Sequence, residues 1–196
     1  FEIFNCSNNY FPKETDFFDG YIITGSAFGV YDEEEWITKL LIKIRDIYKK
    51  NIPLVGICFG HQAIAEALGG KVIKSTKGWG VGIKQMKFNV NKPWINPPIT
   101  NLKLIYSHQD QVIKLPKNSQ ILSGDDFCPI SSFSINNKIF TLQGHPEFKN
   151  DFALKLLDLR KNKIDINQYN IAKKSLIENE HDGRKIGKWI FNFLKQ

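Results

Sequence analysis

The chain has 196 residues, 42% of them hydrophobic and 24% charged, which fits one ordinary α/β domain and excludes a disordered protein. The net charge of +7 comes from scattered lysines without a stripe of interleaved aromatic residues, so we expect no nucleic-acid binding. No apolar run is long enough to span a bilayer, and no signal-peptide pattern opens the sequence. Cys6, Cys58 and Cys128 form neither a disulfide framework nor a zinc motif, so we expect a cytoplasmic protein without a metal.

Short apolar runs alternate with helical patterns in the first third of the chain. Trp36, Leu40, Leu41, Ile44 and Ile47 recur at helical spacing after an acidic turn, whereas the other apolar runs have the length of strands. In chain order the predicted elements are a strand over 2–5, a short buried strand over 21–24, a loop over 25–29, a helix beginning after 32–35, a strand over 53–57 and a helix over 63–68.

Strands dominate the prediction for the rest of the chain. The pattern over 72–90 indicates antiparallel strands, and Pro93, Pro97 and Pro98 mark a loop. Early strand–helix alternation followed by strands predicts a single domain over 1–196, with a parallel sheet and an antiparallel accessory ribbon. The remaining predicted elements are strands over 102–106, 120–123, 131–135 and 139–143, a helix over 152–159 and an amphipathic helix over 185–194.

Cys58 is the candidate nucleophile. It occupies the centre of Gly56-Ile57-Cys58-Phe59-Gly60, a G-x-nucleophile-x-G pattern between a predicted buried strand and a predicted helix. The flanking glycines permit a sharp turn, and the N-terminus of the following helix favours a thiolate. From this motif alone a structural cysteine at a strand end remains an alternative. Cys6 and Cys128 lack such surroundings and are interpreted as structural.

His145 is the candidate base, and Glu147 is the residue expected to orient it. Both lie in Gly144-His145-Pro146-Glu147, which follows the apolar run 139–142 where a strand leaves the sheet. Side chains two positions apart lean the same way in an extended chain, so the carboxylate can hold one ring nitrogen while the other faces the sulfur. Of the other histidines, His61 is interpreted as structural and His181 as solvated. His108 is interpreted as a substrate-loop or supporting residue.

Three separated motifs point to one family. They are GICFGHQ at 56–62, SHQDQV at 107–112 and GHPE at 144–147, and residues 19–26 add a fourth similar stretch. Together they resemble the class I (triad) glutamine amidotransferases, in the branch that includes the amidotransferase domain of GMP synthase. The resemblance implies a flavodoxin-like three-layer α/β sandwich, with a mainly parallel central sheet and a small antiparallel accessory ribbon, and no metal or organic cofactor.

The resemblance also implies roles for individual residues. Cys58, His145 and Glu147 would form the catalytic triad, and the backbone amides of Ser26 and Phe59 would form the oxyanion hole. The substrate-binding residues would be Gln62, through its side chain, and Ser107 and His108, through their main chain, with 78–80 near the pocket mouth.

The chain departs from the family at its oxyanion loop. Many amidotransferases carry Gly-Gly-Pro where this chain has Gly25-Ser26-Ala27, a change that keeps the backbone amide. Residues 24–26, with Val30-Tyr31-Asp32 after them, resemble the stand-alone members, including plant γ-glutamyl peptidases. The family's first strand and helix are not visible here, so we expect them to precede Phe1.

The expected reaction is cysteine-dependent hydrolysis of a γ-glutamyl amide bond through a γ-glutamyl thioester. If ammonia leaves, the substrate is glutamine and a synthetase partner is implied, because the chain has no ATP-binding loop. If an amino acid or peptide leaves, the protein is a stand-alone γ-glutamyl peptidase acting on glutathione-like compounds. A third alternative is a catalytically silent binding protein, against which the intact Cys58, His145 and Glu147 argue.

Overall fold

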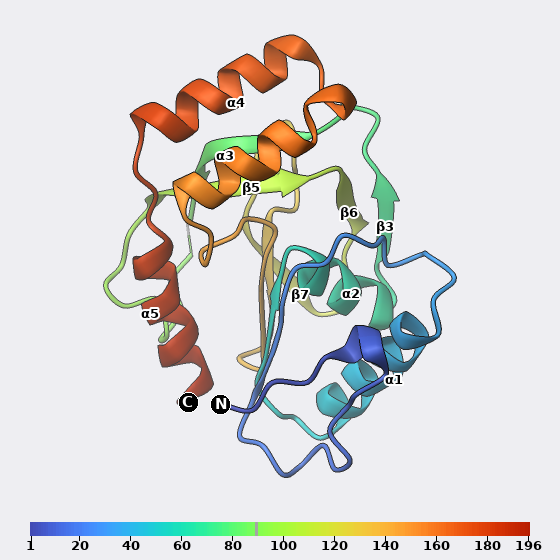
Figure 1. The fold of residues 1–196 in the computed structure, drawn as a ribbon. Helices are drawn as coiled ribbons and strands as arrows, with labels where there is room; N and C mark the ends of the chain where they lie inside the picture. The colour runs from blue at the N-terminus through green and yellow to red at the C-terminus, as the bar shows by residue number, and fades with distance from the viewer. Residues whose placement is uncertain (89) are drawn as a thin grey trace.

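The computed structural model describes residues 1–88 and 90–196, and Figure 1 shows its helices and strands. None of the helices in this part of the chain is long and apolar enough to cross a bilayer. In chain order the elements are a 3₁₀ turn Cys6–Asn8, β1 Tyr21–Ile23, α1 Glu35–Lys49, β2 Leu54–Ile57, α2 Phe59–Ala67, β3 Lys71–Lys74, β4 Gly80–Lys87, β5 Asn101–His108, β6 Asp110–Lys114, β7 Ser119–Ser123, β8 Ser132–Ile135, β9 Ile139–Leu142, α3 Asn150–Leu159, a 3₁₀ turn Lys161–Lys163, α4 Ile166–Glu178 and α5 Gly183–Leu194.

A five-stranded sheet in the order β1-β2-β9-β8-β7 forms the centre of the molecule. β1, β2 and β9 run parallel, and β8 and β7 extend the sheet in the antiparallel sense. Helices α1 and α2 cover one face of this sheet and α5 covers the other, as Figure 1 shows. The predicted three-layer α/β class is confirmed.

The central strands are buried on both faces, which explains why they read as continuous apolar runs. Leu54 of β2 packs on the side of α1 and α2, whereas its neighbour Val55 packs with Phe140, Trp189 and Phe193 on the side of α5. All four residues of β2 and of β9 are buried. Because side chains pack on both faces of these strands, the ends of β2 and β9 hold the residues that follow them in fixed positions.

Two antiparallel pairs, β3 with β6 and β4 with β5, stand beyond the ends of β2 and β9. Helices α3 and α4 pack on the β4–β5 pair and bury Val81, Ile105, Leu157 and Tyr169 in a third core. The antiparallel strands predicted over 72–90 exist, but they pair with later strands rather than with each other, and residue 89 lies outside the described residues.

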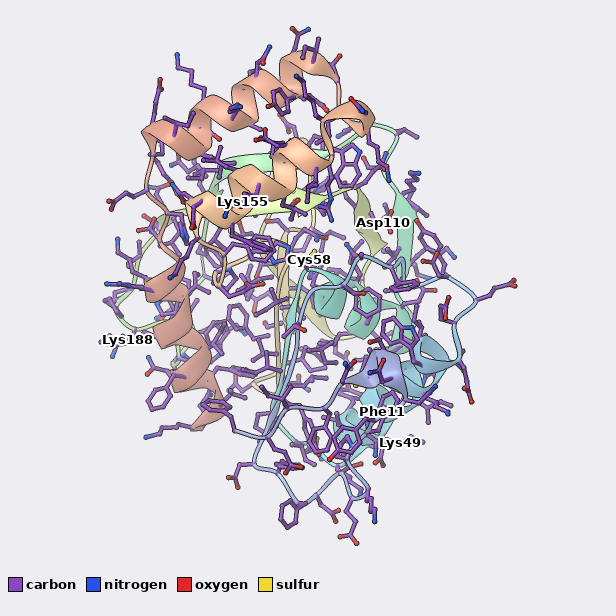
Figure 2. The ribbon with its side chains drawn as sticks, viewed as in Figure 1. Phe11, Lys49, Cys58, Asp110, Lys155 and Lys188 are labelled. Atoms are coloured by element: carbon purple, nitrogen blue, oxygen red, sulfur yellow. The ribbon has the colours of Figure 1, made fainter. Side chains whose placement is uncertain are left out.

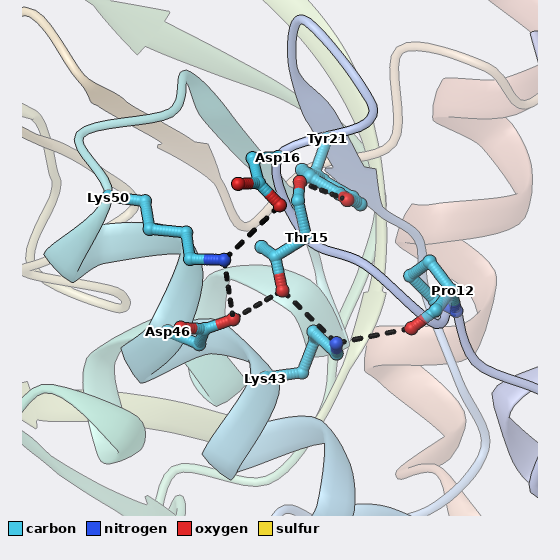
Figure 3. A network of polar contacts seen from close by, with 7 residues as sticks. All are labelled: Pro12, Thr15, Asp16, Tyr21, Lys43, Asp46 and Lys50. Atoms are coloured by element: carbon cyan, nitrogen blue, oxygen red, sulfur yellow. Dashed lines mark hydrogen bonds and ion pairs between the residues drawn. The ribbon is translucent and has the colours of Figure 1, made fainter.

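The strand predicted over 2–5 is wrong. These residues are irregular, and the segment before β1 packs on α1. The aromatic ring of Phe11 packs against the core there, and Figure 3 shows the polar contacts. β1 itself is an edge strand rather than a buried one, with Ile22 39% exposed. The contacts join Tyr21 Oη to the Thr15 carbonyl at 2.7 Å, Lys43 Nζ to the Pro12 carbonyl at 3.1 Å, Lys50 Nζ to Asp16 at 3.3 Å, and Thr15 Oγ1 to Asp46.

Candidate active site

Cys58 sits on a tight turn between β2 and α2, with φ 52° and ψ −102°, a left-handed backbone that side chains other than glycine rarely adopt. Its amide donates to the carbonyl of Leu142 at 2.8 Å, which ties the turn to β9. A Cβ on Gly60 would lie 2.2 Å from the carbonyl oxygen of Ile23, and one on Gly56 would lie 2.6 Å from the backbone of Gly60. Close packing therefore requires both glycines: Gly60 packs against β1, and Gly56 packs against the start of α2.

His145 is held on several sides. Its Nδ1 and Glu147 Oε1 are 2.7 Å apart, and its ring stacks on Phe148 with centroids 3.8 Å apart. Its backbone amide donates to the carbonyl of Ile105 at 2.8 Å. A Cβ on Gly25 would lie 2.9 Å from His145 Cε1, so the loop after β1 closes directly over the imidazole. The ring orientation is consequently fixed before any ligand binds.

The electrostatics favour a charged His145. Burial disfavours the imidazolium, but hydrogen bonds to the Cys58 and Glu147 side chains, and the charges of these groups, outweigh it and raise the pKa of His145 to about 9. Glu147 lies on the outer side of the ring, with its side chain 42% exposed. The carboxylate therefore orients Nδ1 and leaves the other ring nitrogen for the sulfur.

A cavity of about 490 Å³ opens over Cys58, and Figure 2 shows Cys58 near the centre of the molecule, below α3 in that view. Five of the predicted site residues line it, namely Ser26, Cys58, Gln62, Ser107 and His108, and Trp79 from the predicted segment 78–80 lines it as well. Its size lies in the range of small-molecule sites, ~300–1,000 Å³. Tyr31, Lys74, Asp110, Arg160 and Lys163 also line it.

Gln62 is buried, with 3% exposed, at the inner wall of this cavity. Its Nε2 donates to the Asp110 carbonyl at 2.9 Å and to Gln143 Oε1 at 3.1 Å. Gln143 in turn donates to Cys58 Sγ at 3.6 Å. The amide nitrogen of Gln62 is therefore engaged in holding the wall, and its side-chain oxygen is the group that can accept from a ligand.

The side chains of Ser107 and His108 are engaged by the protein. Both the hydroxyl and the carbonyl of Ser107 accept from Arg160 Nη1, at 2.6 and 3.3 Å. His108 is buried, and its Nδ1 bonds to the Asp110 carbonyl at 3.0 Å. Burial lowers the pKa of His108 to about 4 despite that hydrogen bond, and burial likewise lowers the pKa of His61 to about 3. Both rings are therefore neutral near pH 7.

The two amides predicted for an oxyanion hole have no hydrogen-bond acceptor within the described part of the chain. Phe59 is the first residue of α2, where backbone N–H groups have no partner inside the helix. Ser26 lies in the loop after β1 and lines the cavity. Within residues 1–88 and 90–196, no group of three or more His, Cys, Asp or Glu side chains could hold a metal ion.

Comparison with known proteins identifies the family of the chain. The family profile described as glutamine amidotransferase class-I matches residues 4–155. The chain belongs to the class-I glutamine amidotransferases. The family predicted from the motifs is confirmed, and with it the prediction that the protein is an enzyme.

This amidotransferase is similar to proteins that are named for different activities. It is 33% identical to γ-glutamyl peptidase 2 of Arabidopsis thaliana over 204 residues, which cover 99% of this chain and 81% of that protein. It is 34% identical to a glutamine-hydrolysing GMP synthase of Caldicellulosiruptor saccharolyticus over 129 residues, 65% of this chain and 24% of that protein. A glutamine amidotransferase structure from Thermotoga maritima matches the fold with a TM-score of 0.76 at 19% identity, covering 98% of this chain and 83% of that one.

Sequence reasoning missed several residues in or behind the wall of the amidotransferase cavity. Gln143 directly follows β9, and its side-chain amide donates to the sulfur of Cys58. Its place immediately before the GHPE motif could have indicated this role. Tyr31 Oη donates to Asp110 Oδ1 at 2.8 Å across the cavity. Asp110 belongs to the SHQDQV motif, but the sequence predicted no role for it. Arg160 and Lys163 follow α3 and have no sequence signal of their own.

Proposed function

We propose that the protein hydrolyses γ-glutamyl amide bonds with Cys58 as nucleophile, His145 as general acid and base, and Glu147 as the residue that orients His145. The observation that carries this proposal is that His145 interacts with Cys58 on one side and lies 2.7 Å from Glu147 Oε1 on the other, beside a cavity that Cys58 lines. A thiol at a turn before a helix, beside a fixed imidazole, is the arrangement that a cysteine nucleophile requires.

The proposed steps follow from the positions of these groups. His145 holds the proton taken from the thiol, and the sulfur attacks the γ-carbonyl carbon. The amides of Ser26 and Phe59 stabilise the developing oxyanion. His145 then protonates the leaving amine, a γ-glutamyl thioester remains, and water activated by the now neutral imidazole hydrolyses it. Glu147 stabilises the imidazolium in both halves of the reaction.

The γ-glutamyl head would bind against the inner wall. The side-chain oxygen of Gln62 and the carboxylate of Asp110 can accept hydrogen bonds from an α-ammonium group, and both face the cavity that contains Cys58. A site that hydrogen-bonds such groups rejects analogues that lack them, because its own polar groups would otherwise be left unpaired. The proposed substrate is therefore a small molecule with a free γ-glutamyl head.

The similarity to the Arabidopsis γ-glutamyl peptidase favours a peptide as substrate, and the similarity to GMP synthase favours glutamine, with ammonia passed to a synthetase partner. Incubation with glutamine and with γ-glutamyl dipeptides, measuring both ammonia and amine, separates the two. Cys58→Ser should abolish hydrolysis of every substrate, and Cys6→Ser, which changes a thiol of the segment before β1, should leave it intact. Near-normal turnover by Cys58→Ser would exclude the mechanism.

A further inference from the structure

The cavity over Cys58 carries more positive than negative charge. Its lining includes the cationic side chains of Lys74, Arg160 and Lys163, and a single carboxylate, that of Asp110. The charges of Lys74 and Asp110 interact, because Lys74 lowers the pKa of a carboxyl group that burial raises. Arg160 and Lys163 therefore remain as the uncompensated charges of the cavity.

Arg160 is positioned as an anion-binding group would be. Its Nη1 donates to Ser107, and its guanidinium lies over the ring of Trp79, 5.0 Å from the centroid. Burial lowers the pKa of Arg160, and Arg160 lines the same cavity as Cys58. Within the described residues no carboxylate pairs with Arg160 or Lys163. Since a guanidinium has five N–H donors in a planar fork, several remain for a ligand.

The γ-glutamyl head does not supply the missing negative charge. Its α-ammonium and α-carboxylate cancel each other, so glutamine adds no net charge to the cavity. Lys163 is exposed, which places it at the outer part of the lining, whereas Gln62 is buried at the inner wall. A carboxylate located beyond the scissile bond would meet Arg160 and Lys163 while the head contacts Gln62.

We infer that Arg160 and Lys163 form a carboxylate-binding subsite for the leaving group, so that the preferred substrates are γ-glutamyl peptides with a free C-terminal carboxylate rather than glutamine. The inference rests on the proposed γ-glutamyl hydrolysis and names its substrate class. It assigns Arg160 as the main contact, because a charge-assisted hydrogen bond from a half-buried, oriented guanidinium is stronger than one from an exposed lysine.

The test compares γ-glutamylglycine with γ-glutamylglycinamide, which differ only in the terminal carboxylate, and with glutamine. The wild-type enzyme should show kcat/KM at least tenfold higher for the acid than for the amide. Arg160→Gln should lower kcat/KM for the acid roughly tenfold or more, and Lys163→Gln roughly two- to fivefold, with little change for the amide or glutamine. The matched control is Lys161→Gln, since Lys161 lies in the same 3₁₀ turn but over the ring of Tyr169, outside the cavity lining.

Equal kcat/KM for acid and amide in the wild type would overturn the inference. So would an equal loss toward all three substrates in both variants, since that result would assign the two cations to the γ-glutamyl head. Lys163→Gln removes an exposed side chain without a hydrogen bond in the described part of the chain, so it remains informative if Arg160→Gln fails to fold. Calorimetric binding of the acid and the amide to Cys58→Ser separates the two proposals. Tighter binding of the acid without turnover in the wild type would contradict only the proposed hydrolysis.

Discussion

Gly60→Ala tests whether the turn at Cys58 depends on close packing against β1. The new Cβ would lie 2.2 Å from the carbonyl oxygen of Ile23, 2.8 Å from its carbonyl carbon and 2.9 Å from its Cβ. Two of these three are backbone atoms of a sheet strand and cannot move aside as a flexible side chain would. The cost should therefore lie in the upper part of the range for overpacking, about 2–3 kcal/mol of unfolding free energy. For a chain of this size that corresponds to a fall in Tm of about 4–12 °C.

The matched control is Gly187→Ala in α5, where a Cβ meets nothing within 4 Å. Because alanine is favoured over glycine inside a helix, this variant should gain about 0.5–1 kcal/mol. Urea unfolding followed by tryptophan fluorescence measures both, and the rate of alkylation of the folded protein by iodoacetamide reports whether the Cys58 turn has moved. A Gly60→Ala protein within 0.5 kcal/mol of the wild type would refute the packing argument.

Three further predictions concern titration and capping. Because the pKa of His145 is raised to about 9, its protonated form contributes stability that is present below pH 6.5 and is lost as the pH rises to 9. The difference in unfolding free energy between wild type and His145→Asn, measured in urea, should therefore shrink over that interval. A constant difference would contradict the assigned hydrogen bonds. His61 and His108, with pKa values lowered to about 3 and 4, should remain neutral at pH 5 in histidine NMR spectra. The wild-type protein should also lose stability as the pH falls from 6.5, because only the unfolded chain takes up these protons. Asp165→Ala should cost about 1 kcal/mol in thermal or urea unfolding, because the Asp165 side chain accepts from the amides of Asn167 and Gln168 at the start of α4; no loss would show that solvent replaces the cap.

The parallel core and the elbow could be predicted because their signals are local. β2 and β9 are apolar on both faces, and the glycines around Cys58 follow from a turn that leaves no room for side chains. The wrong strand over 2–5 alternates apolar and polar residues but has no neighbouring strand, so tertiary context decided against it. A strand pattern alone does not reveal whether a partner exists.

Pairing between distant strands and the origin of the cationic residues could not be predicted in this way. β4 pairs with β5 across a proline-containing loop, and nothing in its own residues names that partner. α4 was missed because only Tyr169, Ala172 and Leu176 of its thirteen residues are buried, which leaves a weak helical pattern. Arg160 reaches the cavity only because α3 folds back over Ser107, a contact between residues 53 positions apart.

The left-handed backbone of Cys58 implies that the proposed catalytic role and folding stability oppose each other at this position. With φ 52° and ψ −102°, the residue occupies a conformation that glycine adopts freely and that costs other residues about 1–3 kcal/mol. Cys58→Gly should therefore unfold at higher urea concentration than Cys58→Ala, although both lack the sulfur. Cysteine is therefore not the residue that stability favours at this position, and the proposed role as nucleophile accounts for its presence.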